Sequence, residues 1–444
     1  MTRPPCGESN GGMAEPGSIA SPVDVPSGQL SPGARLILRL LPVALAAAAY
    51  LGRPMLMGRE GPRPQRFVAL ADAFWHERLT IVDPRPNELI PSDAAGAFYC
   101  PYPPLPAVVL MPLVALFGAA VKVQTATRVV SVLAVAIFDS CLGRWPALLG
   151  RKPLAPGTRS ALACLFAVGT VVWHCADAGG DWHFAHALAL TAMLLAMREF
   201  AGRNRPLVVG LFVALAAGAR PTAAMTGVFF VIADATRTRP TRDGGAGARL
   251  LPLALGPIAA ALLLGWYNAA RFGSWTDFGY DRMILDEHGS ELLHQYGQFN
   301  VRFIPVNFFW YLLAPPWPPF RPGLGPLAFN PHGMSLFLTT PACLYALAAL
   351  RRIRTDRLVL AATLGILAAL VPLLMYFNTG YFQFGHRFAM DYLPLLMLLI
   401  VMGMGERPSR WACGLIALSI AVHVWGVCFA TATARLPVWM TPTV

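Results

Sequence analysis

Apolar runs of about 17 to 22 residues recur along nearly the whole chain, and each is close to the length a helix needs to cross a bilayer. At 1.5 Å rise per residue, about 20 residues span a hydrocarbon core ~30 Å thick. Only 13% of the residues are charged and 56% are hydrophobic, whereas a soluble domain carries about 25% charged residues. The chain therefore belongs in a membrane. Helices are the expected spanning elements, because each satisfies its own backbone hydrogen bonds in lipid.

The apolar runs predict an all-α, polytopic membrane protein with about 11 to 13 transmembrane helices. The expected spans are 36–52, 126–142, 160–176, 184–200, 206–218, 221–235, 250–268, 334–350, 358–377, 389–405 and 411–430. Two further stretches, 104–121 and 303–317, are short or interrupted by proline. Residues 1–34 are rich in Gly, Pro and Ser without an apolar run, so we expect a disordered tail before a membrane domain over 35–444.

The charged residues predict which loops face the cytoplasm. A net charge of +12 is compatible with nucleic-acid binding, but Arg and Lys lie in short loops instead of one basic stripe, so no nucleic-acid partner is expected. Five loops together hold 17 basic and 5 acidic residues: 143–159, 198–205, 234–249, 351–357 and 406–410. The long segments 53–103 and 269–333 have no such excess. The basic loops are therefore predicted inside and the long segments outside.

The stretch 104–121 conflicts with this scheme if it crosses the membrane completely. A full crossing would place the basic loop 143–159 outside. We therefore expect PPLPAVVLMPLVALFG to re-enter or to insert only partly.

Two acidic residues of the first outer segment are candidate catalytic bases. In RFVALADAFWHERL, apolar residues recur at helical spacing and would lie along the membrane surface, while Asp72 and His76 share the other face. Asp93 precedes the rigid stretch GAFYCPYPPLP. Either carboxylate, held just above the lipid, is suited to deprotonate a hydroxyl. The alternative is an interfacial helix with a solvated polar face.

Polar residues at the predicted outer interface are candidates for substrate binding, because such groups are costly at membrane depth. Arg220 and Arg387 present the planar fork that suits phosphate oxygens, although both positions also fit arginines anchored at the interface. Gln383 lies beside Arg387 in TGYFQFGHRFAMDYLP. The aromatic-rich stretch WYNAARFGSWTDFGYDRM has the mixture that stacks and hydrogen-bonds sugars, or an interfacial aromatic belt. Its candidates are Asn268, Arg271, Asp277 and Tyr280.

No cofactor or metal site is expected. The eight cysteines are scattered without a CxxC spacing. The stretch HCADAGGDWHFAH gathers His174, Asp177, Asp181, His183 and His186, a set that is chemically able to bind a divalent cation. Its spacing matches no established metal motif, and a polar turn at a helix end is the commoner explanation.

The chain resembles bacterial members of the GT-C superfamily of membrane glycosyltransferases, in the style of the dolichyl-phosphate-mannose-protein mannosyltransferase and aminoarabinose transferase group. The stretches RFVALADAFWHERL, GAFYCPYPPLPAVVLMPLVALFG, YNAARFGSWTDFGY and NTGYFQFGHRFAMDYLP carry the resemblance, which covers roughly residues 35 to 430. It departs from the family at Tyr102, where a lysine is expected, and at PRPQR, residues 62–66, where an Asp-Glu pair is usual.

The resemblance implies a bacterial inner-membrane enzyme whose site faces the periplasm or the cell exterior. Its donor would be a polyprenyl-phosphate sugar drawn from the membrane, and its acceptor an envelope glycan, lipid or protein. Asp72 or Asp93 would accept the proton, and Arg220, Arg271 or Arg387 would stabilise the departing lipid phosphate. The alternatives are a transporter or flippase of a lipid-linked saccharide, and a non-catalytic protein of the same fold. No convincing internal repeat supports a transporter.

Overall fold

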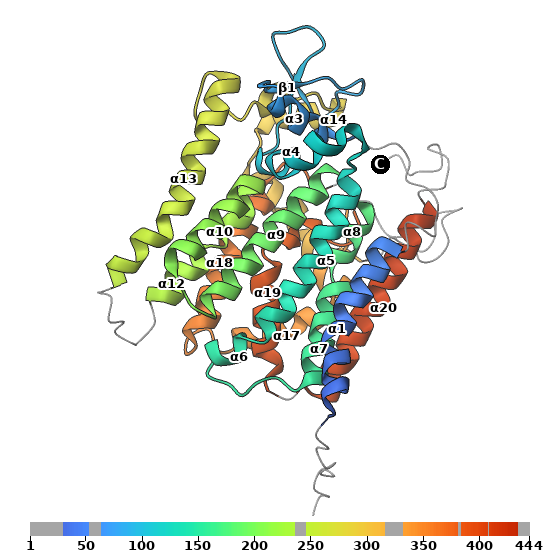
Figure 1. Ribbon diagram of the computed structural model, residues 1–444, viewed down its shortest axis with the longest axis vertical. Coiled ribbons are helices and arrows are strands. Elements are labelled where there is room, and N and C mark those ends of the chain that lie inside the picture. The colour runs from blue at the N-terminus through green and yellow to red at the C-terminus, as the bar shows by residue number, and fades with distance from the viewer. Residues whose placement is uncertain are drawn as a thin grey trace, which may run out of the picture.

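The computed structural model describes residues 30–52, 64–235, 246–315, 332–380, 383–406 and 408–433 of the chain. Long helices stand side by side as one bundle, and shorter elements cover one of its ends (Figure 1). The helices of the bundle are α1 (Pro32–Ala47), α5 (Val123–Leu142), α7 (Pro156–Val168), α8 (Val171–Ala178), α9 (Asp181–Phe200), α10 (Pro206–Ala219), α12 (Val228–Ala235), α13 (Ala246–Phe272), α17 (Leu344–Leu350), α18 (Arg357–Met375), α19 (Leu393–Met404) and α20 (Arg410–Thr433).

The remaining helices are short. Those at the covered end are α3 (Arg66–Trp75), α4 (Leu105–Phe117) and α14 (Glu287–Tyr296). The others of the described chain are α6 (Trp145–Leu148), α11 (Pro221–Met225), α15 (Ile304–Phe308) and α16 (Leu336–Thr339). Five 3-10 helices, η2 (Gly118–Ala120), η3 (Tyr280–Arg282), η4 (Val301–Phe303), η6 (Pro341–Cys343) and η7 (Arg387–Asp391), and two π-helical turns, η1 (Ala48–Gly52) and η5 (Phe309–Leu313), complete this set.

The mostly helical membrane fold agrees with the sequence prediction. Within the described residues, five helices are long and apolar enough to cross a bilayer: α1 with η1, α5, α13, α18 and α20. The pair α7 and α8, bent by 44°, makes a sixth. Other predicted spans are divided among shorter helices, as 221–235 is between α11 and α12. The larger count of 11 to 13 spans stays a prediction.

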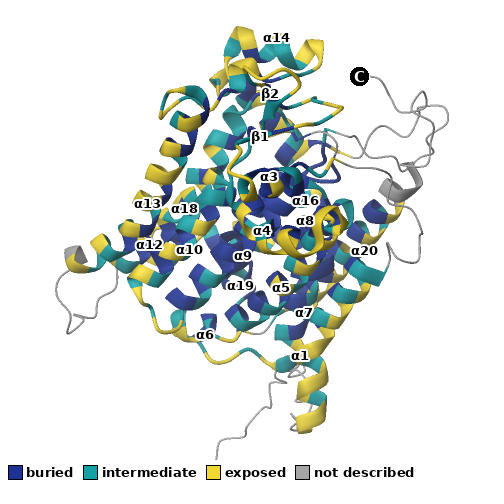
Figure 2. Ribbon diagram, turned by 45° about the horizontal axis from the view of Figure 1, so that its top comes forward, coloured by how far each residue is buried: buried dark blue, intermediate teal, exposed yellow. Residues whose placement is uncertain are grey.

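The central helices are buried and the outer ones are partly exposed (Figure 2). The exposed residues of the outer helices include apolar ones, such as Ile37 of α1 and Leu263 of α13. Nearly every residue of α9 and α19 is buried. In contrast, only 17% of the α1 span window and 28% of the α13 window are buried. A helix that is apolar all round belongs in the core, and one with an exposed apolar face suits lipid contact.

The helix boundaries follow local sequence signals. The N-cap hydroxyl of Ser31 accepts a hydrogen bond from the Ala34 N–H, and Pro32 occupies the first helical position, so α1 begins within the predicted tail of residues 1–34. Most of that tail lies outside the described residues. Asp181, at the start of α9, accepts hydrogen bonds from the backbone N–H groups of Arg66 and Phe67. This carboxylate therefore caps α3 and ties it to the bundle.

The two long segments predicted to lie outside meet at the covered end of the bundle. The Glu88 N–H donates to the Ile284 carbonyl at 2.5 Å, and the Ile284 N–H donates to the Leu89 carbonyl at 2.9 Å. The first segment also forms a small antiparallel sheet in the order β1-β3-β2, a departure from the expected all-α fold. Its strands, β1 (Thr80–Ile81), β2 (Ile90–Pro91) and β3 (Phe98–Tyr99), are too short to leave an alternating pattern.

The stretch 104–121 starts and ends at the same end of the bundle, as the charge pattern required. Gln65, next to α3, accepts a hydrogen bond from the Val123 N–H at 2.9 Å and donates to the Gln124 side chain at 2.8 Å. The 13 residues of α4 reach only about 20 Å. The apolar face of α3 packs on α4, with Phe67 and Leu70 in one buried cluster with Leu110. Part of the face expected along the membrane surface is therefore covered by α4, while Trp75 remains exposed.

Arginines of two predicted cytoplasmic loops converge at the opposite end of the bundle. Arg151 donates to the carbonyls of Val401 and Met402, and Arg352 donates to Met402 at 2.7 Å. These carbonyls end α19, where the helix dipole favours positive charge. The structure therefore separates the predicted inner loops from the predicted outer segments.

Cysteine labelling tests which end faces the cytoplasm. In a chain whose exposed native cysteines are replaced by serine, Asp93→Cys is expected to react with an impermeant thiol reagent on intact cells. Arg354→Cys should react only after the membrane is permeabilised, because both residues are exposed but lie in segments of opposite predicted location. The reverse pattern would contradict the orientation.

A close helix contact offers a stability test with a matched control. A Cβ added at Gly403 of α19 would lie 1.8 Å from the Tyr345 carbonyl oxygen of α17, whereas one at Gly414 of α20 meets nothing within 4 Å. Gly403→Ala should therefore lower the melting temperature in detergent, with a typical overpacking cost of about 1–3 kcal/mol. Gly414→Ala should be neutral or stabilising, since Ala favours helix. Equal melting temperatures would rule out this contact.

Candidate functional site

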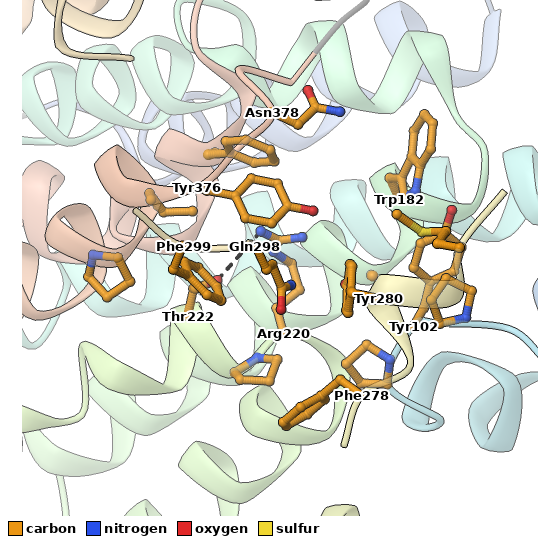
Figure 3. Close-up of a pocket in the computed structure, with 18 of the residues that line it drawn as sticks. Tyr102, Trp182, Arg220, Thr222, Phe278, Tyr280, Gln298, Phe299, Tyr376 and Asn378 are labelled. Carbon is orange, nitrogen blue, oxygen red and sulfur yellow. Dashed lines mark hydrogen bonds between the residues drawn. The ribbon is translucent and has the colours of Figure 1, made fainter. Parts of the chain in front are cut away.

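A cavity of about 340 Å³ lies where the covering elements meet the bundle (Figure 3). Its walls come from the segment before α4, the start of α9, the turn between α10 and α11, the end of α13, the segment around η3, the end of α18 and η7. The polar and aromatic side chains that line it include Glu88, Tyr102, Trp182, Arg220, Thr222, Tyr267, Asn268, Arg271, Tyr280, Gln298, Tyr376, Asn378 and Arg387. Its size suits part of a small organic ligand.

Arg220 reaches the cavity from the break between α10 and α11, where Pro221 ends the first helix. Its Nε and Nη2 atoms donate to the two oxygens of Asp391 at 2.7 and 2.9 Å. Asp391 is fully buried, and it also accepts from Thr222 and lies 3.0 Å from His186 Nδ1. The Arg220 guanidinium lies among Phe299, Tyr280 and Tyr376 (Figure 3). The two hydrogen bonds to Asp391 fix its position and balance its charge.

Arg387 is a buried cation with no carboxylate at ion-pair distance among the described residues, although Glu88 in the same cavity attracts it. The residue is 5% exposed, and its Nε atom has no hydrogen-bond partner within the described chain. The guanidinium lies over the rings of Trp182 and Phe388, with its central carbon 4.9 and 5.2 Å from their centroids. Gln383 accepts a hydrogen bond from the Arg387 backbone N–H at 2.9 Å. A buried unpaired charge is costly, so this side chain is prepared for an anionic ligand.

Arg271 lines the cavity and donates its hydrogen bonds to uncharged acceptors. It donates to the carbonyls of Tyr267 and Cys100 and to the side-chain oxygen of Asn268. Its guanidinium carbon also lies 3.8 Å from the centre of the Tyr267 ring. These contacts tie α13 to the first outer segment, so Arg271 contributes positive charge to the wall while it holds the wall together.

Glu88 is the acidic residue that lines the cavity. Its side chain is 20% exposed, lies 3.4 Å from Arg66 and accepts a hydrogen bond from the Tyr102 hydroxyl at 3.3 Å. Its φ of 64° is in the left-handed region, which is uncommon and strained for a residue with a side chain. Burial raises the pKa of Glu88 above its ordinary value despite the attraction of Arg66.

The cavity brings together five of the nine residues predicted from the sequence: Arg220, Asn268, Arg271, Tyr280 and Arg387. Gln383 lies behind Arg387 and positions its backbone. Asp277 is outside the lining, where it accepts from the Gly279 N–H and pairs with Arg282.

The two predicted bases do not line the cavity. Asp72 is exposed on α3, 3.4 Å from Arg78 and 3.6 Å from His76. Asp93 is exposed in the bend before β3. Their catalytic role stays a prediction, and the structure offers Glu88 as a third carboxylate.

The cavity is also lined by Glu88, Trp182 and Tyr376, and Asp391 pairs with Arg220. None of these four was among the site residues predicted from the sequence. Glu88 was one of six acidic residues in its segment, and nothing in the sequence separates it from the others. Asp391 had a usable signal, because it opens a predicted span and acidic residues within spans mark sites.

The predicted His and Asp cluster is divided among separate partners. His186 faces Asp391, Asp181 caps α3, and the His174 ring accepts a hydrogen bond from the Phe384 N–H. No group of three metal-ligating side chains gathers within the described residues. The outside possibility of a cation at this cluster has no geometric support.

Comparisons with known proteins give one likeness. No family model and no curated protein matches the chain. Among solved structures, it is similar to the oligosaccharyltransferase of Archaeoglobus fulgidus in the apo form, with a TM-score of 0.49 and 12% sequence identity. The match covers 90% of this chain and 56% of that chain, so this chain spans little more than half its length. A likeness of this size establishes neither family nor activity.

Proposed function

We propose that this protein is a membrane glycosyltransferase that transfers a sugar from a polyprenyl-phosphate donor to an envelope glycan, lipid or protein acceptor. The observation that carries the proposal is the presence of two groups, a cation and a carboxyl group, in one cavity at the covered end of the bundle. Arg387 is a buried cation without a carboxylate at ion-pair distance in the described chain. Glu88 has a left-handed backbone conformation and a carboxyl group with a raised pKa.

Arg387 would bind the phosphate of the donor. The bond between the sugar carbon and the phosphate oxygen breaks in the reaction, and negative charge grows on that oxygen. A fixed guanidinium in a site of low polarity stabilises this charge without rearranging. Arg271 adds positive charge at the cavity wall, whereas Arg220 already forms an ion pair with Asp391.

Glu88 would accept the proton that the acceptor hydroxyl loses as its oxygen bonds to the sugar. A general base works best when its pKa lies near the operating pH, and burial raises the pKa of Glu88 in that direction. Direct attack by the acceptor predicts inversion at the sugar carbon. The aromatic side chains Trp182, Tyr280 and Tyr376 offer stacking surfaces for the sugar.

A deletion strain distinguishes this function from its alternatives. Loss of one sugar from the envelope glycans, with accumulation of its intact polyprenyl-phosphate carrier, would support a transferase. The purified protein in nanodiscs should then release free polyprenyl phosphate only when the acceptor is present. Movement of a lipid-linked saccharide across proteoliposomes without cleavage would instead establish a flippase. Unchanged glycans and carriers would leave the non-catalytic alternative.

A further inference from the structure

A second cavity, of about 630 Å³, lies at the end of the bundle opposite the candidate site. It is enclosed by the first turns of α1, the end of α5, the segment around α6 and the start of α7. Figure 1 shows these segments together at the end farthest from α3 and α14. This is the end that the basic loops predict to face the cytoplasm.

The walls of this cavity carry excess positive charge. Arg35, Arg39 and Arg159 line it with one acidic residue, Asp139. Arg159 neutralises that carboxylate, with its Nε atom 2.7 Å from Asp139 Oδ1. Arg35 and Arg39 stand one helical turn apart on α1, and within the described residues neither has a carboxylate at ion-pair distance. Arg35 Nε donates to the Leu30 carbonyl at 3.0 Å, so two exposed cations border the space without a carboxylate partner in the described chain.

The rest of the wall is apolar and continues onto the outer face of α1. Leu36, Leu38, Leu142 and Leu154 line the cavity. One turn beyond Leu36, Leu40 is also exposed on α1. An amphiphile would thus find two cations for its head and an apolar strip for its chains.

We propose that this cavity binds the phosphate headgroup of an anionic phospholipid of the inner leaflet, with its acyl chains along α1. Phosphate is the anion that arginine side chains bind best, and basic pockets between helices at the cytoplasmic interface attract acidic lipids. The position of the cavity beside exposed apolar residues of α1 favours a lipid over free phosphate, because only a lipid contacts both the arginines and these apolar residues. The proposal does not depend on the proposed catalytic function.

Native mass spectrometry of the full chain tests the proposal with phosphatidylglycerol and phosphatidylcholine as probes. We expect one phosphatidylglycerol to bind tightly and phosphatidylcholine to bind weakly. Arg35→Gln with Arg39→Gln should weaken phosphatidylglycerol binding about 30-fold, at about 1 kcal/mol for each basic residue. Arg351→Gln with Arg354→Gln removes the same charge from exposed arginines outside the cavity, and should leave the affinity unchanged.

Three controls keep the result decisive. Arg35→Lys with Arg39→Lys should retain most of the binding, and a melting temperature equal to wild type shows that the glutamine variant is folded. Inorganic phosphate should fail to displace the lipid at millimolar concentration. Displacement by phosphate would show that the cavity is a site for the free anion. Equal losses in the two double glutamine variants, or equal binding of both lipids, would overturn the proposal.

Discussion

Arg387→Gln is expected to weaken binding of a polyprenyl-phosphate sugar by roughly 30- to 1000-fold, or about 2 to 4 kcal/mol. The reason is that Arg387 faces the cavity without a carboxylate at ion-pair distance in the described chain, so the donor phosphate would be its direct partner. The same change should leave the melting temperature of the ligand-free protein equal or higher, because it removes a buried charge that lacks compensation. Lower affinity with undiminished stability is the signature of a ligand-binding arginine.

Arg302→Gln is the matched control for this prediction. Arg302 lies at the same end of the molecule, over the Tyr296 ring at 4.7 Å, but it is exposed and outside the cavity lining. Donor affinity, measured by titration in nanodiscs, should not change. Arg387→Lys should recover part of the affinity, since lysine keeps the charge and loses the fork. A destabilised Arg387→Gln protein with normal donor binding would identify Arg387 as a structural anchor.

The sequence predicted the mostly helical membrane fold because the bilayer dictates the length and composition of its helices, while the count of 11 to 13 spans stays a prediction. The predicted span 126–142 corresponds to α5, and 358–377 corresponds to α18. The charge pattern grouped the basic loops at one end of the bundle, where Arg151 and Arg352 meet at the end of α19, and their cytoplasmic location stays a prediction. The subdivision of 221–235 at the break after α11 was not predictable, because an apolar composition does not show where a helix bends.

The sequence predicted the arginines that line the cavity better than its carboxylate. An arginine at interface depth is conspicuous in an apolar chain, and Arg220, Arg271 and Arg387 all line the cavity. Acidic residues are common in the outer segments, so choosing among them needs tertiary information. The backbone pairing of Glu88 with Ile284 joins positions nearly 200 residues apart, and this pairing turns Glu88 toward the cavity while Asp72 stays exposed.

The ion pair with Asp391 changes the role that the sequence predicted for Arg220. Arg220 was one of three arginines expected to stabilise the phosphate, but its bidentate contact with Asp391 satisfies much of its charge. The sequence distance between the two residues hides this pair. Once it is known, Arg387 becomes the stronger candidate for the phosphate and Arg220 a fixed part of the wall.

Glu88→Gln is expected to lower the rate of sugar transfer by about 10² to 10⁴ and to leave donor binding nearly unchanged. Gln preserves the size of the side chain and its hydrogen bond with Tyr102 but cannot accept a proton. Folding should survive, because Arg66 keeps its contact with Asp83 at 3.3 Å. The wild-type rate should fall as the pH drops through the raised pKa of Glu88, since only the carboxylate is a base. Glu88→Gln should abolish this acid limb of the pH profile.

Glu77→Gln is a closely matched control for Glu88→Gln. Glu77 lies in the same outer segment and has a similar left-handed φ of 57°, but its side chain is exposed and outside the cavity. Its substitution tests the effect of removing a negative charge from a strained backbone position, and transfer should stay at the wild-type rate. Asp72→Asn and Asp93→Asn complete the comparison. If either of them removes transfer and its acid limb while Glu88→Gln retains both, the base lies at the membrane surface as the sequence predicted, and Glu88 only positions Arg66.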